Sequence, residues 1–245
     1  MKRKIFQWTL PPEIERRLGD SSYGRQRAIF EAGNLLLILH APPGPDDLTR
    51  EFRVFLRTAD GRYQCNGIAD GQVQLRRLLA DYRTLYDELE EAYQKAHTSE
   101  ELFRLLESVA PAGRSAGNMR DALQAAREYV KEDTLLIAMR DEAYEVARNF
   151  EILLGDVRSA LDFRIARNAE MQAAKSAEMA LAQHKLNVLA AITFPLMAIA
   201  TLLGMNLAHG FENAPPIFFY LVFALGLIVG LAVKSWVTNG EKKDG

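Results

Sequence analysis

The sequence contains a single cysteine, no long basic run and no clustered histidines. Because Cys65 has no second thiol, an intrachain disulfide and a paired-thiol metal site within one chain are excluded. The 30 lysines and arginines are balanced by 32 aspartates and glutamates, so the charge pattern gives no support for a nucleic-acid partner. The four histidines are too scattered to form a ligand set within one chain.

Motifs of nucleotide-driven and hydrolytic enzymes are also missing. The sequence has neither a glycine-rich phosphate loop ending in lysine nor a Gly-x-Ser-x-Gly element. We therefore expect neither an enzyme nor a resident cofactor. The basic start, Met1 to Lys4, meets Gln7, Pro11 and Pro12 before any apolar core, so no signal peptide is expected.

Charge is confined to one part of the chain. Residues 1–185 carry nearly all of it, whereas residues 186–233 carry only Glu212. The chain therefore combines a water-soluble part with an apolar part. The patterns within them predict an α+β fold, predominantly α, in which a small N-terminal antiparallel or mixed sheet precedes helices.

Short apolar segments separated by turn residues predict the sheet. Ala32-Gly33-Asn34 and Ala59-Asp60-Gly61 are the expected hairpin turns. The expected strands are Ile5 to Leu10, Arg27 to Glu31, Leu35 to His40, Glu51 to Thr58 and Arg62 to Ile68.

Helical spacing begins after Gly71 and continues to the C-terminal region. A first amphipathic helix is expected to about His97, and either Thr98 or Ser99 can cap a short second one. Pro111 to Gly117 is the expected break, so we predict a cytosolic α/β domain over residues 1–117 and a stalk region over 118–185. The stalk is expected to be one continuous helix or two helices with a joint near Gly155-Asp156, and its apolar stripe is equally compatible with an ordinary bundle core.

Two apolar segments are long enough to cross a bilayer. Residues 186–205 are uncharged and span about 30 Å as a helix, and residues 217–237 form a second span. The connecting loop, 206–216, contains no lysine, whereas lysines flank the other ends of both spans and occur in the tail, 238–245. The positive-inside rule then predicts a multi-pass protein of the inner (plasma) membrane with both termini cytoplasmic.

A single helical hairpin cannot enclose a pore, so a conducting protein of this layout must be an oligomer. The first span is the better lining candidate because it continues the stalk and ends at Asn206. A ring of asparagine carboxamides would present oxygens to a hydrated cation without a tight grip. Gly226 and Gly230 form a small-xxx-small step that permits close helix packing.

The segment around Gly204-Met205-Asn206 resembles the defining pattern of the CorA family of magnesium and cobalt channels. This tripeptide ends the penultimate span, Pro195 lies nine residues earlier, and Glu212 matches an acidic loop position, although Phe211 replaces the usual proline. The resemblance implies a homopentamer whose Asn206 ring selects hydrated Mg²⁺, with Co²⁺ and Ni²⁺ as further ions.

The resemblance also implies which residues line the pore. These are Gln183, Leu186, Asn187, Ala190, Phe194, Met197 and Thr201. Leu186, Phe194 and Met197 would form hydrophobic constrictions. His209 and Glu212 in the outer loop would attract cations. Ala180 stands where the family has a further asparagine, so the inner polar ring is missing or displaced to Gln183 or Asn187.

Asp162 matches a stalk aspartate that binds regulatory Mg²⁺ in the family, although Arg164 replaces the adjacent tyrosine. The competing interpretation is a solvated aspartate paired with Arg158 or Arg164. Two alternatives to the magnesium channel also stay open from the sequence: a zinc transporter of the same fold, and a membrane-anchored scaffold that conducts nothing.

Overall fold

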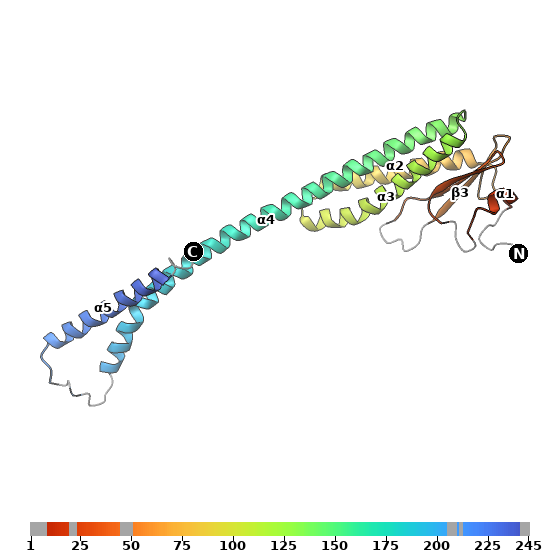
Figure 1. Cartoon of the computed structure of the whole chain (residues 1–245). Helices are drawn as coiled ribbons and strands as arrows, with labels where there is room; N and C mark the ends of the chain where they lie inside the picture. Colours follow the sequence, from red (N-terminus) through yellow and green to blue (C-terminus); the bar gives the residue numbers. More distant parts are fainter. Residues whose placement is uncertain (1–8, 20–23, 45–50, 205–209, 211–212, 241–245) are drawn as a thin grey trace. The chain divides into compact units, whose positions relative to one another are not determined.

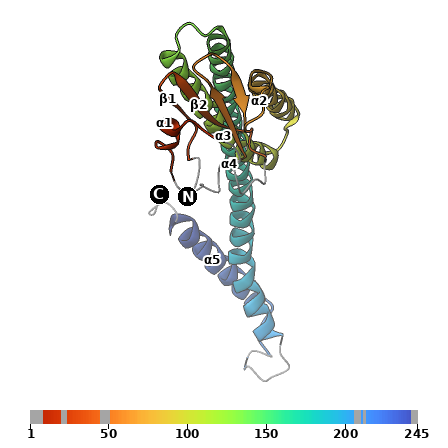
Figure 2. The same ribbon diagram turned by 90° about the vertical axis from the view of Figure 1, so that its right-hand side faces the viewer.

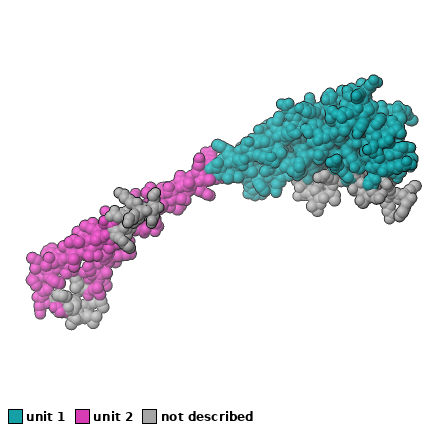
Figure 3. Space-filling view, in the orientation of Figure 1, with its two compact units in different colours: residues 1–166 teal, residues 167–245 magenta. Residues whose placement is uncertain are grey.

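The computed structural model describes residues 9–19, 24–44, 51–204, 210 and 213–240. The chain divides into two compact units, residues 1–166 and 167–245 (Figure 3). The division falls inside the longest helix, α4 (Thr134–Leu203). Each unit is described separately below.

The first unit contains a four-stranded antiparallel sheet in the order β1-β2-β3-β4. Its strands are β1 (Arg27–Glu31), β2 (Asn34–His40), β3 (Phe52–Arg57) and β4 (Tyr63–Cys65). Ala32 and Gly33 both adopt positive φ, as a two-residue hairpin connection requires. These strands and both turns confirm the sequence prediction. Of the strand expected at residues 5–10, only residues 9 and 10 lie in the described part, and they are not in a strand.

Both faces of the sheet are covered. The short helix α1 (Pro12–Glu15) packs Ile14 against the face that contains Leu36, Ile38, Val54 and Leu56. The opposite face, with Leu35, Leu37, Leu39 and Phe55, packs against α2 (Gly71–Lys95), α3 (Ser99–Tyr129) and the first part of α4 (Figure 2). Because side chains alternate along a strand, β2 supplies both cores, which explains its nearly continuous apolar run.

The break expected at Pro111 to Gly117 is wrong, because α3 runs through Pro111 to Tyr129. Ala112, Ala116 and Met119 are fully buried in the helical core, so tertiary packing stabilises the helix despite the backbone hydrogen bond that proline cannot donate. The expected second helix is therefore longer than predicted, and the boundary proposed at residue 117 falls within it.

Of the two alternatives for the stalk, neither matches fully: there is no joint at Gly155-Asp156, and the helix is not continuous from residue 118. α4 passes through Gly155 without interruption, whereas the chain turns at Val130 to Asp133, between α3 and α4. Asp133 caps α4: its Oδ1 accepts hydrogen bonds from the backbone N–H groups of Leu135 (3.0 Å) and Leu136 (3.2 Å).

The other oxygen of Asp133 binds the sheet. Its Oδ2 accepts from Nε of Arg57 at 2.6 Å and from the hydroxyl of Tyr63 at 2.9 Å. Burial alone raises the pKa of this carboxyl group, but the hydrogen bonds from Arg57 and Tyr63 outweigh it, so the net pKa lies below the ordinary value. One side chain thus joins β3, β4 and the first turn of α4.

The second unit consists of the last part of α4 and α5 (Ile217–Gly240), which meet near Gly226 and Gly230 and separate toward the connecting loop (Figure 1). Both predicted spans are helical in the structure, and α4 ends at Leu203. The first unit supplies the sheet and most buried side chains, and the second supplies the apolar helices.

Candidate ion pathway

Two helices of the described chain are long and apolar enough to cross a membrane. The most apolar stretch of α4 contains no buried residue, and only 11% of the corresponding stretch of α5 is buried. A core helix of a soluble domain would instead be mostly buried. The exposure of so many large apolar side chains therefore calls for an apolar environment or further protein around them.

The two glycines of α5 set how it packs on α4. A Cβ added at Gly230 would lie 2.9 Å from the backbone oxygen of Ile192, and one at Gly226 would lie 3.5 Å or less from side-chain atoms of Leu196 and Ile199. Both glycines are buried. Ile192, Leu196 and Ile199 thus define the α5-facing side of α4, and the predicted small-xxx-small step is a true close approach.

The predicted pore-lining residues lie on the other side of α4. At about 100° per residue, these positions are centred roughly half a turn away from Ile192, Leu196 and Ile199. They are Gln183, Leu186, Asn187, Ala190, Phe194, Met197 and Thr201, of which all but the half-buried Ala190 are exposed. Leu186, Phe194 and Met197 expose 61%, 66% and 61% of their surface, so α5 does not cover them.

Hydroxyl groups on α4 bond to their own helix. Thr201 donates to the carbonyl oxygen of Met197 at 2.7 Å, and Thr193 donates to that of Leu189 at 3.0 Å. Because its proton is used within the helix, the Thr201 oxygen offers only lone pairs to its surroundings. On the exposed face, that arrangement suits a positively charged species better than an anion.

The helix ends next to the predicted filter. The backbone N–H of Gly204 donates to the carbonyl of Ala200 at 3.0 Å, and a Cβ at Gly204 would approach that carbonyl to 3.1 Å. Gly204 is exposed and completes the last turn of α4. The other predicted filter and outer-loop residues, Met205, Asn206, His209 and Glu212, lie outside the described residues.

Asp162, the candidate regulatory ligand, lies in the first unit. Its side chain is exposed, and among the described residues it has no ion-pair partner. Arg164 instead donates to the backbone oxygen of Ala96 at 3.3 Å, at the C-terminal end of α2. Within the described ranges of this single chain, no three acidic, histidine or cysteine side chains form a metal-binding group.

The stalk portion of α4, residues 165–183, packs against no other described part of the chain. Every residue from 165 to 183 is exposed, including Met171, Met179 and Leu181. By contrast, Phe150, Leu153 and Val157 of the same helix are buried against α2 and α3. Sequence periodicity could not separate these two segments, because both carry apolar residues at helical spacing.

Comparison with known proteins decides the family. The family described as CorA-like Mg²⁺ transporter protein matches residues 70–242, well over half of the chain. The chain belongs to this family. CorA-like proteins are membrane proteins that transport divalent cations and assemble as homo-oligomers, and they are not enzymes. The resemblance noted at Gly204-Met205-Asn206 is thereby confirmed at the level of the family.

Two solved structures are similar to this CorA-like chain. The CorA magnesium transporter from Methanocaldococcus jannaschii is 18% identical, with a TM-score of 0.44 over 90% of this chain and 80% of that one. The full-length CmaX protein is 15% identical, with a TM-score of 0.49 over 95% of this chain and 82% of that one. No curated protein sequence matches the chain at a significant level.

Proposed function

We propose that the chain forms a homopentameric channel of the inner membrane that passes hydrated divalent cations, Mg²⁺ first and also Co²⁺ and Ni²⁺. α4 lines the axis, α5 faces lipid and neighbouring helices, and both termini lie in the cytoplasm. The observation that carries the proposal is the exposed face of α4 from Gln183 to Thr201, which lies opposite the side covered by α5.

The stalk supports the oligomer. A helix in water is stabilised mainly by packing of one face, and residues 165–183 make no such packing within one chain. Five copies side by side would cover Met179, which lies on the same side of α4 as Thr201, and they would bring five Thr201 oxygens around one axis. We therefore treat the exposed α4 surface as the subunit contact and pore surface together.

The filter in this proposal is a ring of Asn206, which follows Gly204 and Met205. Neutral carboxamide oxygens bind a hydrated divalent ion weakly enough for it to leave again. Mg²⁺ holds its water shell tightly, so contact through water suits it. His209 and Glu212 raise the local cation concentration at the entrance.

Hydrophobic constrictions then close the pore. Leu186, Phe194 and Met197 lie on the lining face, and rings of such side chains block ions by excluding water. Asp162 remains our candidate for cytosolic Mg²⁺ sensing, with a ligand set completed by neighbouring subunits. No resident cofactor is required, because Mg²⁺ acts as cargo and as regulator.

The test is ion uptake by proteoliposomes that contain the full-length chain. We expect uptake of Mg²⁺, Co²⁺ and Ni²⁺, and at least a tenfold reduction with Asn206→Ala. Asn213→Ala is the matched control: this exposed asparagine lies outside the proposed filter, and its replacement should leave uptake unchanged.

Three outcomes contradict parts of the proposal. Absence of flux for every ion, from a well-formed oligomer, would favour the non-conducting scaffold. Flux restricted to Zn²⁺ would favour the zinc transporter. Selective flux that Asn206→Ala does not change would remove the carboxamide ring from the mechanism.

A further inference from the structure

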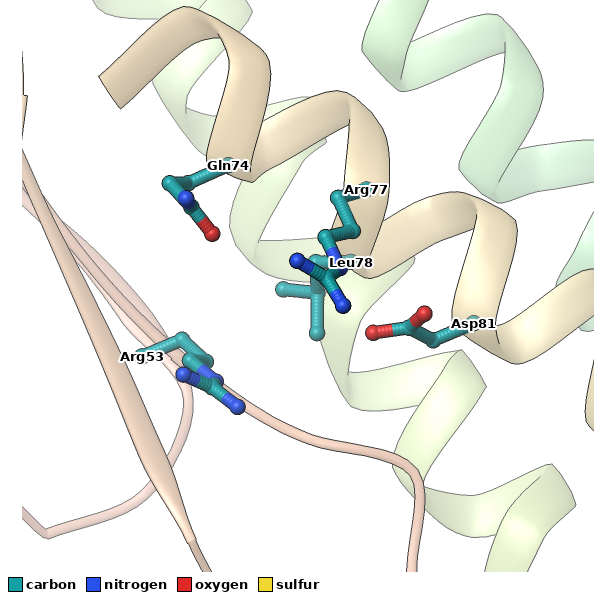
Figure 4. Close-up of a pocket in the computed structure, with 5 residues that line it drawn as sticks. All are labelled: Arg53, Gln74, Arg77, Leu78 and Asp81. Atoms are coloured by element: carbon teal, nitrogen blue, oxygen red, sulfur yellow. The ribbon is translucent and has the colours of Figure 1, made fainter. Parts of the chain in front are cut away.

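A small pocket lies between β3 and α2, in the first unit and far along the chain from the ion pathway. It has a volume of about 170 Å³ and is lined by Arg53, Gln74, Arg77, Leu78 and Asp81 (Figure 4). A space of this size accepts one small ion or molecule and is too small for a nucleotide. Nothing in the proposed transport mechanism uses these residues.

The sheet directs an arginine into this pocket. Along β3, Arg53 shares its side with Phe55 and Arg57, which is the face covered by the helices, because alternate residues point the same way. Arg53 is therefore only partly exposed. Its guanidinium group also binds Glu51 at 2.8 Å, which uses part of its hydrogen-bonding capacity and leaves other N–H groups available.

The helix supplies a second guanidinium group. Gln74, Arg77, Leu78 and Asp81 recur at three- and four-residue steps, so they occupy one face of α2. Arg77 has no ion-pair or hydrogen-bond partner within the part of the chain that the structure describes. Figure 4 shows the side chains of Arg53 and Arg77 extending toward the same space, with Asp81 beside Arg77.

Two acceptors complete the pocket. The amide nitrogen of Gln74 donates to Oδ2 of Asp70 at 2.8 Å, so the amide oxygen of Gln74 is left to accept a hydrogen bond from elsewhere. Asp81 contributes a carboxylate that also accepts. The floor is Leu78, which is only 2% exposed. The pocket therefore combines two guanidinium groups, which donate hydrogen bonds, with two oxygen acceptors and an apolar floor.

We propose that this pocket binds a small protonated oxyanion, with inorganic phosphate as its type. Arg53 and Arg77 donate to the unprotonated oxygens, since guanidinium groups match the geometry of phosphate. The P–OH group that phosphate retains near neutral pH donates a hydrogen bond to the Asp81 carboxylate. Sulfate carries no such proton, so its oxygen would meet the Asp81 carboxylate with like charge, and the pocket discriminates against it.

Equilibrium dialysis of radiolabelled phosphate against the detergent-purified full-length chain tests this site. We expect saturable binding at one site per chain, weakened at least tenfold by Arg77→Gln and by Arg53→Gln. Arg76→Gln is the matched control: this neighbouring arginine of α2 is exposed, lies outside the pocket, and its replacement changes the net charge equally. It should change the affinity less than twofold.

Asp81→Asn gives the more specific readout. Sulfate should compete poorly with phosphate on the native chain and should compete at least tenfold better on this variant, because an amide can donate to an unprotonated oxygen. Absence of saturable phosphate binding overturns the site, as does equal weakening by Arg76→Gln and Arg77→Gln. Equal competition by sulfate on the native chain and on Asp81→Asn overturns the role of Asp81. Because binding is measured without ion flux, these results stand apart from the Asn206→Ala uptake experiment.

Discussion

The two ends of α4 meet very different surroundings. Near its start, Leu136, Phe150 and Val157 are fully buried against α2 and α3, and Asp133 ties the first turn to the sheet. From residue 165 to 183 no residue is buried or even half-buried, and the following part of α4 contacts α5 at Gly226 and Gly230. The helix is thus stabilised within one chain at one end, whereas at the other end it exposes apolar side chains that the proposed bilayer and oligomer would cover.

This contrast predicts where substitutions act. Changes in the first unit should alter the free energy of unfolding of a single chain, in the amounts known for globular cores. Changes at the contact between α4 and α5 should alter assembly and leave the first unit folded. The predictions below separate these two effects.

The largest effect is expected from Gly230→Leu. The added side chain would meet the Ile192 backbone, which cannot move aside as a flexible side chain can, so α5 must separate from α4. We expect the assembled oligomer to be lost in size-exclusion chromatography with light scattering, while the near-ultraviolet circular dichroism of the first unit is retained.

Gly155→Leu is the control for that substitution. It introduces leucine into α4 instead of α5, but the added Cβ meets no atom within 4 Å, and replacing glycine inside a helix favours the helix by about 1 kcal/mol. Gly226→Leu should be intermediate, because its added Cβ meets side chains of Leu196 and Ile199. An intact oligomer of Gly230→Leu would contradict the close helix contact.

A smaller effect, confined to the first unit, is expected from Asp133→Ala. The substitution removes the cap of α4 and leaves the guanidinium group of Arg57, whose side chain is only 17% exposed, without its carboxylate. Because the pair is only partly buried, we expect a loss of about 2–3 kcal/mol, the cost of removing a hydrogen-bond partner from a charged group. Unfolding of the full chain by guanidinium chloride in nonionic detergent, followed at the first transition, measures this loss in the free energy of unfolding.

The pH dependence sharpens this prediction. Because the pKa of Asp133 is lowered in the folded chain, its stabilising contribution is complete above the ordinary carboxyl pKa of about 3.9 and is lost as the pH falls through the lowered value. The native chain should therefore lose more stability between about pH 5 and pH 2.5 than Asp133→Ala does. Asp141→Ala, an exposed aspartate on the same helix, should stay within about 0.5 kcal/mol of the native chain.

Local signals in the sequence were sufficient for the sheet and the membrane helices. Short apolar segments on either side of the turn at Ala32-Gly33 predicted β1 and β2, and uninterrupted apolar runs predicted the spans in α4 and α5. In these segments the local preference and the tertiary packing agree. Such agreement is what makes a pattern readable from sequence alone.

The joints between helices were not predictable in the same way. Pro111 suggested a break, but its helix is held by burial of Ala112 and Ala116, whereas Lys131-Glu132-Asp133 has no breaker and is where the chain turns. That turn depends on Arg57 and Tyr63, about 70 residues earlier, through hydrogen bonds to Asp133. A local pattern contains no information about such distant partners.

The candidate ion pathway was also predictable only in part. The resemblance to the CorA family assigned residues from Gln183 to Thr201 to one pore face, and α5 leaves these residues exposed apart from the half-buried Ala190. The sequence identified Gly226 and Gly230 as a close-packing step but could not name Ile192 as the contact, because the register of α4 against α5 is a tertiary property. The Asn206 ring stays a prediction.

The smallest effect is expected at the start of α3, where the sequence allowed either Thr98 or Ser99 as the cap. Thr98 is the cap: its Oγ1 accepts from the backbone N–H of Glu101 at 3.1 Å, and the Glu101 carboxylate accepts from the backbone N–H groups of His97 and Thr98. These backbone hydrogen bonds lower the pKa of Glu101. This reciprocal pair is a capping box.

Thr98→Ala should therefore lower the free energy of unfolding of the first unit by about 1 kcal/mol, the usual effect of removing a cap, and leave oligomer size unchanged. Ser99→Ala removes a hydroxyl group one residue later, inside the first turn, and should cost at most a few tenths of that amount. Guanidinium unfolding of both variants in parallel compares them. Equal losses would mean that the hydroxyl of Thr98 does not hold the start of α3, and the helix would then depend on its buried residues alone, beginning with Leu102.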